Sequence, residues 1–312
     1  MDAVLVDEQL IAPERLRELC KRSNGPSTRR LLAQVALLVG TAVGLGFVDQ
    51  PALIALLLVV HGVVHFGFFG LLHEASHKTA FTSAGLNSFA GWIAALSQPM
   101  VPALMRAFHF THHRHTHQLD EGDPELAGLA FMAQWPRGPM WLATMSGVPV
   151  LVARAGWALF TALVPPALDG AWTKVLPFVR PERRRRIAWE SRGLVLIHAG
   201  IMAAAILVEP RIWRFYWGML AGHMFLSWYI TCEHRGLSGE GTILERTRTL
   251  EVPGVIRWLV WNMPYHAEHH GWPAVPWHAL PELHAEVEPH LVHRERPLYL
   301  HFHGGRERER AA

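Results

Sequence analysis

Cysteine is nearly absent from this chain, and its absence excludes most sulfur chemistry. Only Cys20 and Cys232 occur among 312 residues, and they form no C-x-x-C pair. A thiolate metal site or a disulfide framework needs cysteines in closer groups. The four-cysteine clusters of iron–sulfur proteins and the haem-binding motifs are missing too. Any electrons that the protein needs are therefore expected to come from a separate carrier.

Charge is scarce as well. Lys, Arg, Asp and Glu make up 18% of the chain and hydrophobic residues 50%, and the mean hydropathy is +0.14. This composition favours a membrane-embedded protein over a soluble domain. The formal net charge of +3 does not indicate a nucleic-acid partner, because the arginines lie in short blocks beside apolar stretches rather than along one recognition face.

Four apolar stretches are predicted to be transmembrane helices, since a crossing needs about 20 residues. They are residues 31–48, 51–72, 193–208 and 212–232. Arginine blocks before the first and third stretches place both termini and the central loop in the cytoplasm. The first stretch begins too late and runs too long for a signal peptide, so we expect all of these segments to be retained.

The rest of the chain is assigned around these spans. The predicted parts are a cytoplasmic N-terminal segment (1–30), a membrane domain (31–285) and a polar C-terminal tail (286–312). Residues 79–105 also lack charge, and we expect them to leave and return as a re-entrant or in-plane pair of short helices broken near residues 97–102. Residues 139–170 are predicted to form a similar interfacial hairpin, with an extra helix pair as the alternative.

Histidine, in contrast, is abundant, with 21 residues. Eight of them form three tight clusters, spaced H-x-x-x-H, H-x-x-H-H and H-x-x-H-H: His73 and His77; His109, His112 and His113; His266, His269 and His270. Neutral imidazole is the commonest protein metal ligand, and residues three or four apart share one face of a helix. Eight nitrogens are too many for one ion, so the clusters predict two metals, with iron as the redox candidate. The predicted topology places all three clusters on the cytoplasmic side.

Other interpretations of the clusters are weaker. The first could be an exposed polar helix end, and the second could be a basic surface strip, although that leaves Phe108 and Phe110 without a purpose. A chance repeat of the H-x-x-H-H spacing far along the chain is improbable. Carboxylates near the clusters could orient the rings through their outer nitrogens, with surface solvation as the alternative for each. These candidates are Glu74, Asp123 and Glu268.

The three clusters resemble the histidine boxes of the membrane fatty acid desaturase superfamily, over roughly residues 30–285. Asn262-Met-Pro-Tyr before the third box, and Asp123-Pro124-Glu125 after the second, are also similar to that family. The resemblance implies an all-α integral membrane fold, with four transmembrane helices and a cytoplasmic helical cap that holds a di-iron site. It further implies that O2 and two electrons are used to attack an unactivated C–H bond.

The resemblance also implies the ligand set. The eight box histidines are the expected iron ligands, and His234 resembles the additional ligand of acyl-CoA desaturases. Those relatives carry an Asn one turn before that ligand, where this chain has Ile230. Asn262 could supply an amide instead, with a capping or turn role as the alternative. Imidazole suits such a site because it resists oxidation, whereas thiolate does not.

The expected function is that of an O2-dependent desaturase that places a C=C bond in an acyl lipid, with electrons from a separate ferredoxin or cytochrome b5-type donor. A hydroxylase or ketolase of a hydrophobic substrate is the alternative within the family, and His-Glu-Ala-Ser-His in the first box is nearer the acyl desaturases. A histidine-rich metal transporter is the alternative outside it, but only His61, His65, His198 and His223 lie along the spans as a pathway would require. For His61, His65 and His223 we expect a tunnel-lining or hydrogen-bonding role. Arg far outnumbers Lys, which is typical of a bacterial protein, so the bacterial inner membrane is the expected location.

Overall fold

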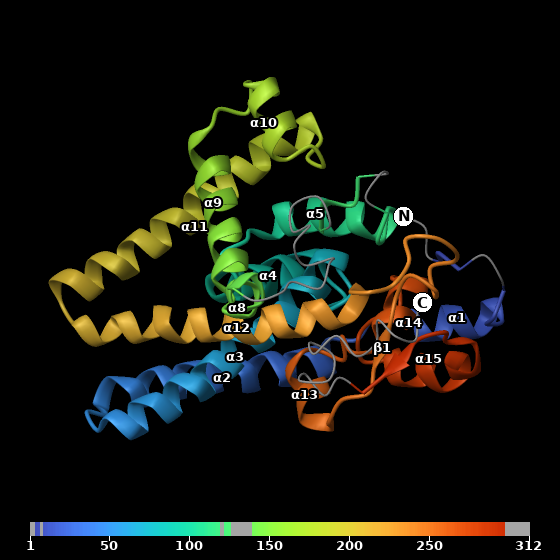
Figure 1. Cartoon of the computed structure of the whole chain (residues 1–312), viewed down its shortest axis with the longest axis horizontal. Coiled ribbons are helices and arrows are strands. Elements are labelled where there is room, and N and C mark those ends of the chain that lie inside the picture. The colour runs from blue at the N-terminus through green and yellow to red at the C-terminus, as the bar shows by residue number, and fades with distance from the viewer. Residues whose placement is uncertain (1–3, 7–8, 119–121, 126–138, 297–312) are drawn as a thin grey trace. The chain divides into compact units, whose positions relative to one another are not determined.

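The computed structural model describes residues 4–6, 9–118, 122–125 and 139–296, and it is mostly helical (Figure 1). The chain forms two compact units by internal contacts. Unit 1 comprises Met1–Arg22, Phe110–Met145 and Ser227–Ala312, and unit 2 comprises Ser23–His109 and Ser146–Leu226. Each unit is built from segments that are far apart in the sequence.

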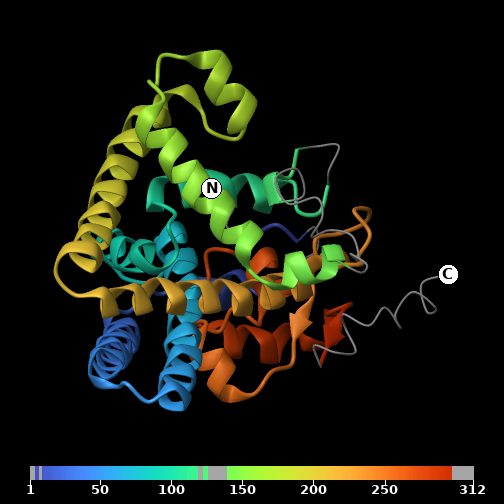
Figure 2. The ribbon, with the colours of Figure 1, turned by 60° about the vertical axis from the view of Figure 1, so that its left-hand side comes forward.

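Unit 2 consists of long helices. They are α2 (Asn24–Phe47), α3 (Pro51–His77), α4 (Ala84–Ser97), α9 (Val148–Leu163), α10 (Asp169–Val175), α11 (Pro181–Leu207) and the short η1 (Pro210–Ile212). The pairs α2 with α3, α3 with α4, and α9 with α11 pack against each other, and the first pair is seen side by side in Figures 1 and 2. Proline at the first turn starts α3 and α11, because its fixed φ suits that position.

Two further helices run from one unit into the other along the chain, α5 (Pro102–Arg114) and α12 (Trp213–His234). The break between α4 and α5 at residues 98–101 confirms the predicted pair of short helices. With 14 residues, α4 is shorter than the roughly 20 residues that cross a bilayer. The predicted re-entrant or in-plane course of this part of the chain stays a prediction.

Three helical stretches are long and apolar enough to cross a membrane: Pro13–Phe47, Pro51–His77 and Pro181–Leu207. They cover the first three predicted spans to within one residue. Counting α8 (Pro139–Met145) and α9 together as one broken span would give a fourth. The predicted crossing at 212–232 is helical as α12 but is not among these stretches, because residues such as Arg214, His223 and Glu233 lower its hydropathy. That crossing stays a prediction.

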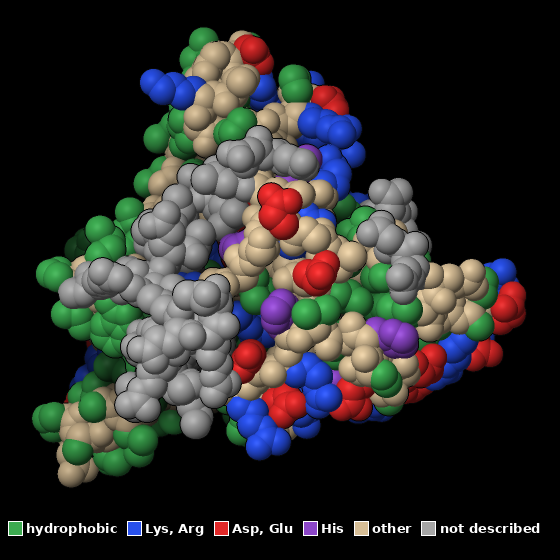
Figure 3. Space-filling view, turned by 45° about the vertical axis from the view of Figure 1, so that its right-hand side comes forward, with side chains coloured by type: hydrophobic (Ala, Val, Ile, Leu, Met, Phe, Trp, Pro, Cys, Tyr) green, Lys and Arg blue, Asp and Glu red, His purple; other side chains and the backbone are tan. Residues whose placement is uncertain are grey.

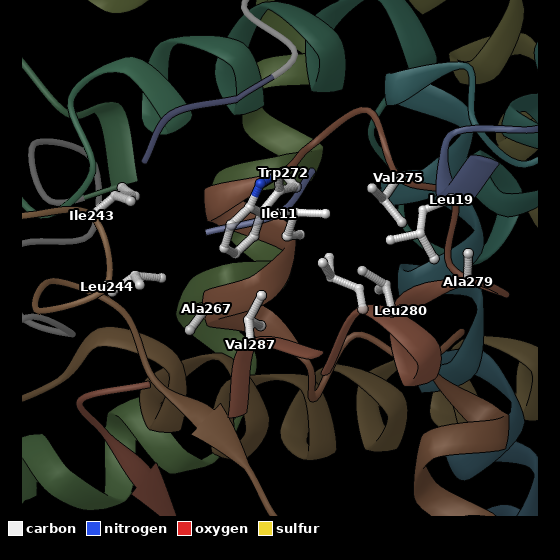
Figure 4. Close-up of a cluster of buried hydrophobic side chains, with 11 residues drawn as sticks. Ile11, Leu19, Ile243, Leu244, Ala267, Trp272, Val275, Ala279, Leu280 and Val287 are labelled. Atoms are coloured by element: carbon white, nitrogen blue, oxygen red, sulfur yellow. The ribbon is translucent and has the colours of Figure 1, made fainter. Parts of the chain in front are cut away.

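Unit 1 is built from short elements around a small hydrophobic core. They are α1 (Pro13–Leu19), α8, α13 (Gly254–Leu259), α14 (His266–Gly271), α15 (Leu280–Val287), η2 (Glu288–His290), β1 (Thr249–Leu250) and β2 (Arg294–Glu295). The core gathers Ile11, Trp272, Val275 and Leu280, among others, around α14 and α15 (Figure 4). The parallel β1–β2 pair adds two strands of two residues each to an otherwise helical chain, and such short strands carry no periodicity that a sequence pattern could reveal.

Exposed side chains fit a membrane environment for unit 2. Large hydrophobic residues are exposed along α2, α3 and α11, including Phe47 at 82%, Leu196 at 72% and Leu207 at 80%. Contiguous apolar exposure of this kind marks a lipid or protein contact surface rather than a water-facing one. Patches of hydrophobic side chains are visible on the face drawn in Figure 3.

Candidate metal centre

The first group of histidines lies in unit 2, where α3 ends. His73 and His77 stand four residues apart on its final turns, and His109 approaches them from α5. The ring centroids lie 4.2 Å apart for His73 and His109, 4.8 Å for His77 and His109, and 5.0 Å for His73 and His77. All three side chains are buried. The structure thus brings the first predicted cluster together with the first histidine of the second.

A buried carboxylate accompanies this group. Glu74 Oε1 lies 3.5 Å from His73 Nδ1, and Glu74 Oε2 accepts a hydrogen bond of 2.8 Å from the Thr79 hydroxyl. Glu74 has no exposed surface. The surface-solvation alternative is therefore wrong for this residue, and its charge acts directly on the histidine group.

The second group lies in unit 1 and joins three helices. Its metal-binding atoms all lie within 4.8 Å of one another, and its members are His112 on α5, His234 on α12, and His266 and His270 on α14. The four side chains are buried. His234 Nε2 and His266 Nε2 are 2.8 Å apart. We call these four residues the quartet, and it places His234 beside the box histidines.

Each ring of the quartet has an outer polar neighbour at Nδ1. These neighbours are Asp123 Oδ1 at 3.0 Å from His112, the Arg246 carbonyl at 3.0 Å from His234, Glu233 Oε1 at 3.3 Å from His266 and Thr116 Oγ1 at 3.1 Å from His270. An acceptor at Nδ1 keeps the proton there and leaves the Nε2 lone pair for a metal. These hydrogen bonds hold the rings of His112, His234 and His270 so that Nε2 can face inward, and Glu233 lies close to the His266 ring.

The quartet fits a metal ion by its donors and spacing. Two nitrogens that bind one ion at about 2.0–2.1 Å, roughly at right angles, lie about 2.9 Å apart, close to the 2.8 Å between His234 and His266. His270 Nε2 is buried without a hydrogen-bond partner among the described residues, a costly state that a metal would relieve. An all-imidazole set without thiolate is compatible with iron.

Negative charge surrounds His112. Burial lowers the pKa of this imidazole, but the carboxylates of Asp123 and Glu125 outweigh burial and raise it to about 9. Asp123 also accepts hydrogen bonds from the backbone N–H groups of His117 and Glu125. Burial raises the pKa of the Asp123 carboxyl, and His112 with these hydrogen bonds lowers it below its usual value overall. The local field therefore favours a cation at the quartet.

The two remaining box histidines lie beside the quartet in unit 1. His113 Nε2 and His269 Nε2 are 3.1 Å apart, and the His113 ring stacks on His270 with centroids 4.1 Å apart. Of the nine predicted ligands, unit 2 thus groups His73, His77 and His109, and unit 1 groups the other six. Each of the nine predicted ligands thus lies close to other predicted ligands of the same unit.

Sequence reasoning missed several of the outer neighbours. Glu233 directly precedes His234, and this adjacency was a usable signal, whereas Thr116 and the Arg246 carbonyl carried none. Asp123 was predicted to orient a ring and contacts His112. Glu268, also buried, instead accepts a hydrogen bond of 2.6 Å from Thr249 and pairs with His284.

Two further residues near the histidine groups have other contacts. Asn262 has a left-handed φ of 57° and donates a hydrogen bond to the Trp277 carbonyl, which favours the turn role over the alternative of an amide beside iron. His117 bonds the Leu237 carbonyl and stacks over His234 with centroids 6.0 Å apart. It therefore covers one side of the quartet.

A protein-family model described as fatty acid desaturase matches residues 50–302, which is most of the 312 residues. The matched region contains all three histidine clusters and His234. The chain matches none of the curated proteins with which it was compared.

Proposed function

The chain belongs to the fatty acid desaturase family, and on that basis we propose that it is an O2-dependent enzyme that introduces a C=C bond into the aliphatic chain of a lipid. Membership of the family makes it an oxidoreductase of the desaturase or hydroxylase type. The quartet is the observation that carries the proposal, because four buried imidazoles with outer partners form a sulfur-free site suited to a redox metal.

We assign two irons to the nine histidines. The quartet holds one iron. The ligands of the second iron include His73, His77 and His109. The two remaining predicted ligands are His113 and His269. When bound, the irons supply the one-electron redox chemistry that activates O2. In balance, a CH2–CH2 unit and O2, with two electrons and two protons from outside, give CH=CH and two molecules of water.

The chain's own residues hold and shield this chemistry. Asp123 keeps the His112 proton on Nδ1, and Glu233 Oε1 lies 3.3 Å from Nδ1 of His266. Burial of the ligands excludes bulk water, which protects a reactive site from side reactions. The histidines thereby remain fixed while the redox state of the site changes.

The setting of the enzyme is part of the proposal. The arginine blocks favour a cytoplasmic location for both termini and for the histidine boxes, in a bacterial inner membrane. Electrons come from a separate ferredoxin or cytochrome b5-type protein. Hydroxylation or ketone formation is the second candidate outcome in this family, and His-Glu-Ala-Ser-His in the first box favours desaturation over it.

Lipid analysis by mass spectrometry tests the proposal directly. Lipids from cells that express the full chain are compared with those from cells that express His269→Ala, and His290→Ala, at an exposed histidine, serves as the control. We expect a loss of two hydrogens in lipid chains with the wild type and the control, and none with His269→Ala. A gain of one oxygen would establish hydroxylation instead. Unchanged lipids despite a full iron content would contradict the fatty-acyl assignment.

A further inference from the structure

A second group of buried polar residues lies within unit 2, apart from the metal-binding histidines. We call it the polar seam, and its members are His61 and His65 on α3, Ser97 and Gln98 at the end of α4, Arg154 on α9 and His223 on α12. All are fully buried except Arg154, which is 8% exposed. His65 lies two turns before His73, roughly 12 Å along the helix axis. Polar groups inside a membrane span are costly, so they usually serve a function.

The direction of the hydrogen bonds along α3 fixes the protons of two imidazoles. The Thr41 hydroxyl donates to the Leu37 carbonyl at 2.7 Å, so its oxygen accepts from His61 Nδ1 at 2.6 Å. With its proton on Nδ1, a neutral His61 has an acceptor at Nε2. His65 Nε2, 3.1 Å away, must then be the donor. His65 Nδ1 is therefore left with an unprotonated lone pair.

His223 reaches the same state by a shorter route. Its Nδ1 lies 2.9 Å from the Met219 carbonyl, which can only accept a hydrogen bond. The proton is therefore on Nδ1, and Nε2 is an acceptor. His65 Nδ1 and His223 Nε2 are both buried without a hydrogen-bond partner among the described residues, as is the Ser97 hydroxyl. The seam thus holds two acceptors that need donors.

The Gln98 amide cannot supply the missing donors, because both of its ends already form hydrogen bonds. Gln98 Nε2 donates to the His65 carbonyl at 2.7 Å, and its oxygen accepts from Arg154. The Arg154 guanidinium also lies over the Phe69 ring, 5.6 Å from its centroid. These contacts hold the seam in place and use both ends of the amide.

Close packing keeps the two rings from turning away. A Cβ on Gly222 would lie 2.7 Å from the His65 Cβ, and one on Gly218 would lie 2.3 Å from the His61 ring. Phe215 packs edge-on against His65 with ring centroids 4.9 Å apart. Because α3 and α12 approach this closely, the acceptor atoms stay where they are.

We propose that the polar seam binds a hydroxyl group of the lipid substrate, which donates a hydrogen bond to His65 Nδ1 or His223 Nε2. This inference rests on the proposed function and narrows its substrate class to hydrophobic chains that carry an alcohol. A hydroxyl supplies the missing donor, whereas a methyl end, a ketone or a carboxylate has no hydrogen to give. The position of the seam along α3 separates the hydroxyl from the carbon oxidised near His73 by roughly 12 Å.

The test uses the purified full-length chain with its iron in lipid nanodiscs. Competition with a fluorescent fatty acid gives the Kd of three probes of equal length: methyl hexadecanoate, its terminal hydroxyl derivative and its terminal aldehyde. Satisfying a buried acceptor should favour the hydroxyl ester by at least about fivefold over the other two. The preference should fall to near one in the double variant His65→Phe/His223→Phe.

Two further variants keep the outcome interpretable. His198→Phe alters another histidine of unit 2, which bonds Tyr216 and lies outside the seam, and it should keep the full preference. His223→Gln, which retains an acceptor oxygen, should keep part of it even if the double variant folds poorly. Equal Kd values for the three probes in the wild type, or an aldehyde that binds like the alcohol, would overturn the inference.

Iron content and lipid oxidation are measured on the same samples, so that the two proposals can fail separately. Retained iron and lipid oxidation without a hydroxyl preference would contradict the polar seam alone. A hydroxyl preference in a chain that holds no iron would contradict the proposed function alone. A preference that survives in the double variant would also overturn the assignment to His65 and His223.

Discussion

The quartet in unit 1 and the polar seam in unit 2 are both made of buried histidines, yet they suit different ligands. In the quartet, every Nδ1 has an outer neighbour, and the metal-binding atoms converge within 4.8 Å. In the seam, a chain of hydrogen bonds uses one nitrogen after another and leaves single lone pairs on His65 and His223. Histidine and burial alone therefore do not define a metal site, because the outer partner decides which nitrogen is free and where it points.

Removal of a quartet ligand should have the largest effect. His270→Ala removes one of the four metal-binding nitrogens of the quartet. We therefore expect lipid oxidation to fall by more than the roughly 10- to 100-fold that is typical of losing an outer partner of a ligand. Iron bound per chain should fall with it, as measured by elemental analysis. His223→Phe in the seam should leave the iron content unchanged. Equal iron loss in both variants would erase the distinction between the two regions.

Removal of an outer partner should have a smaller effect. In Asp123→Asn, the amide can no longer accept from His112 and from both backbone N–H groups, so we expect iron to be lost to a chelator with roughly 10- to 100-fold lower affinity. Chelator competition on the purified protein measures this. Asp169→Asn is the control, since its 74% exposed side chain pairs with Arg184. Wild-type affinity in Asp123→Asn would remove the orienting role.

A substitution that disturbs the tight packing at the seam should lower the stability of the protein and leave its iron content unchanged. In Gly222→Ala, the new Cβ meets His65, and we expect a loss of about 1–3 kcal/mol from overpacking. Gly200→Ala on α11 meets nothing within 4 Å and should be neutral or stabilising by up to about 1 kcal/mol. Thermal unfolding in detergent compares the two. A Gly222→Ala protein as stable as the wild type would show that α3 and α12 are not in close contact.

The smallest effect is expected at the start of the seam's hydrogen-bond chain. Thr41→Val keeps the shape but removes the acceptor of the His61 proton, which should cost about 1 kcal/mol of stability. The iron content should not change, and the hydroxyl preference should weaken because His61 can then carry its proton on either nitrogen. A Kd ratio that stays at the wild-type value would show that Thr41 does not set the tautomers.

The sequence predicts the ligands better than their surroundings. The spacing within each box places His73 with His77, and His266 with His270, on one helix face, because such contacts are local. The missing charge in residues 79–105 likewise predicts the break at residues 98–101, since a segment between two boxes must return. The Arg246 carbonyl beside His234 could not be found, because any residue has a carbonyl and only the folded chain brings this one near.

The membrane crossings show the same limit. Helices α2, α3 and α11 carry long apolar faces that composition alone reveals, whereas α12 combines a predicted crossing with buried His223 and Glu233. These residues lower its hydropathy while they serve contacts within the fold. A helix that lines a polar site cannot be as apolar as one that faces lipid, so hydropathy is least informative where function is concentrated.

Metal analysis of the purified full-length chain tests the central claim most directly. The chain is purified without oxygen, and its iron and zinc are quantified per protein by elemental mass spectrometry. The account predicts two irons per chain, a lower value in His270→Ala and the wild-type value in His223→Phe. Zinc in place of iron, or a chain that retains two irons after His270→Ala, would contradict it.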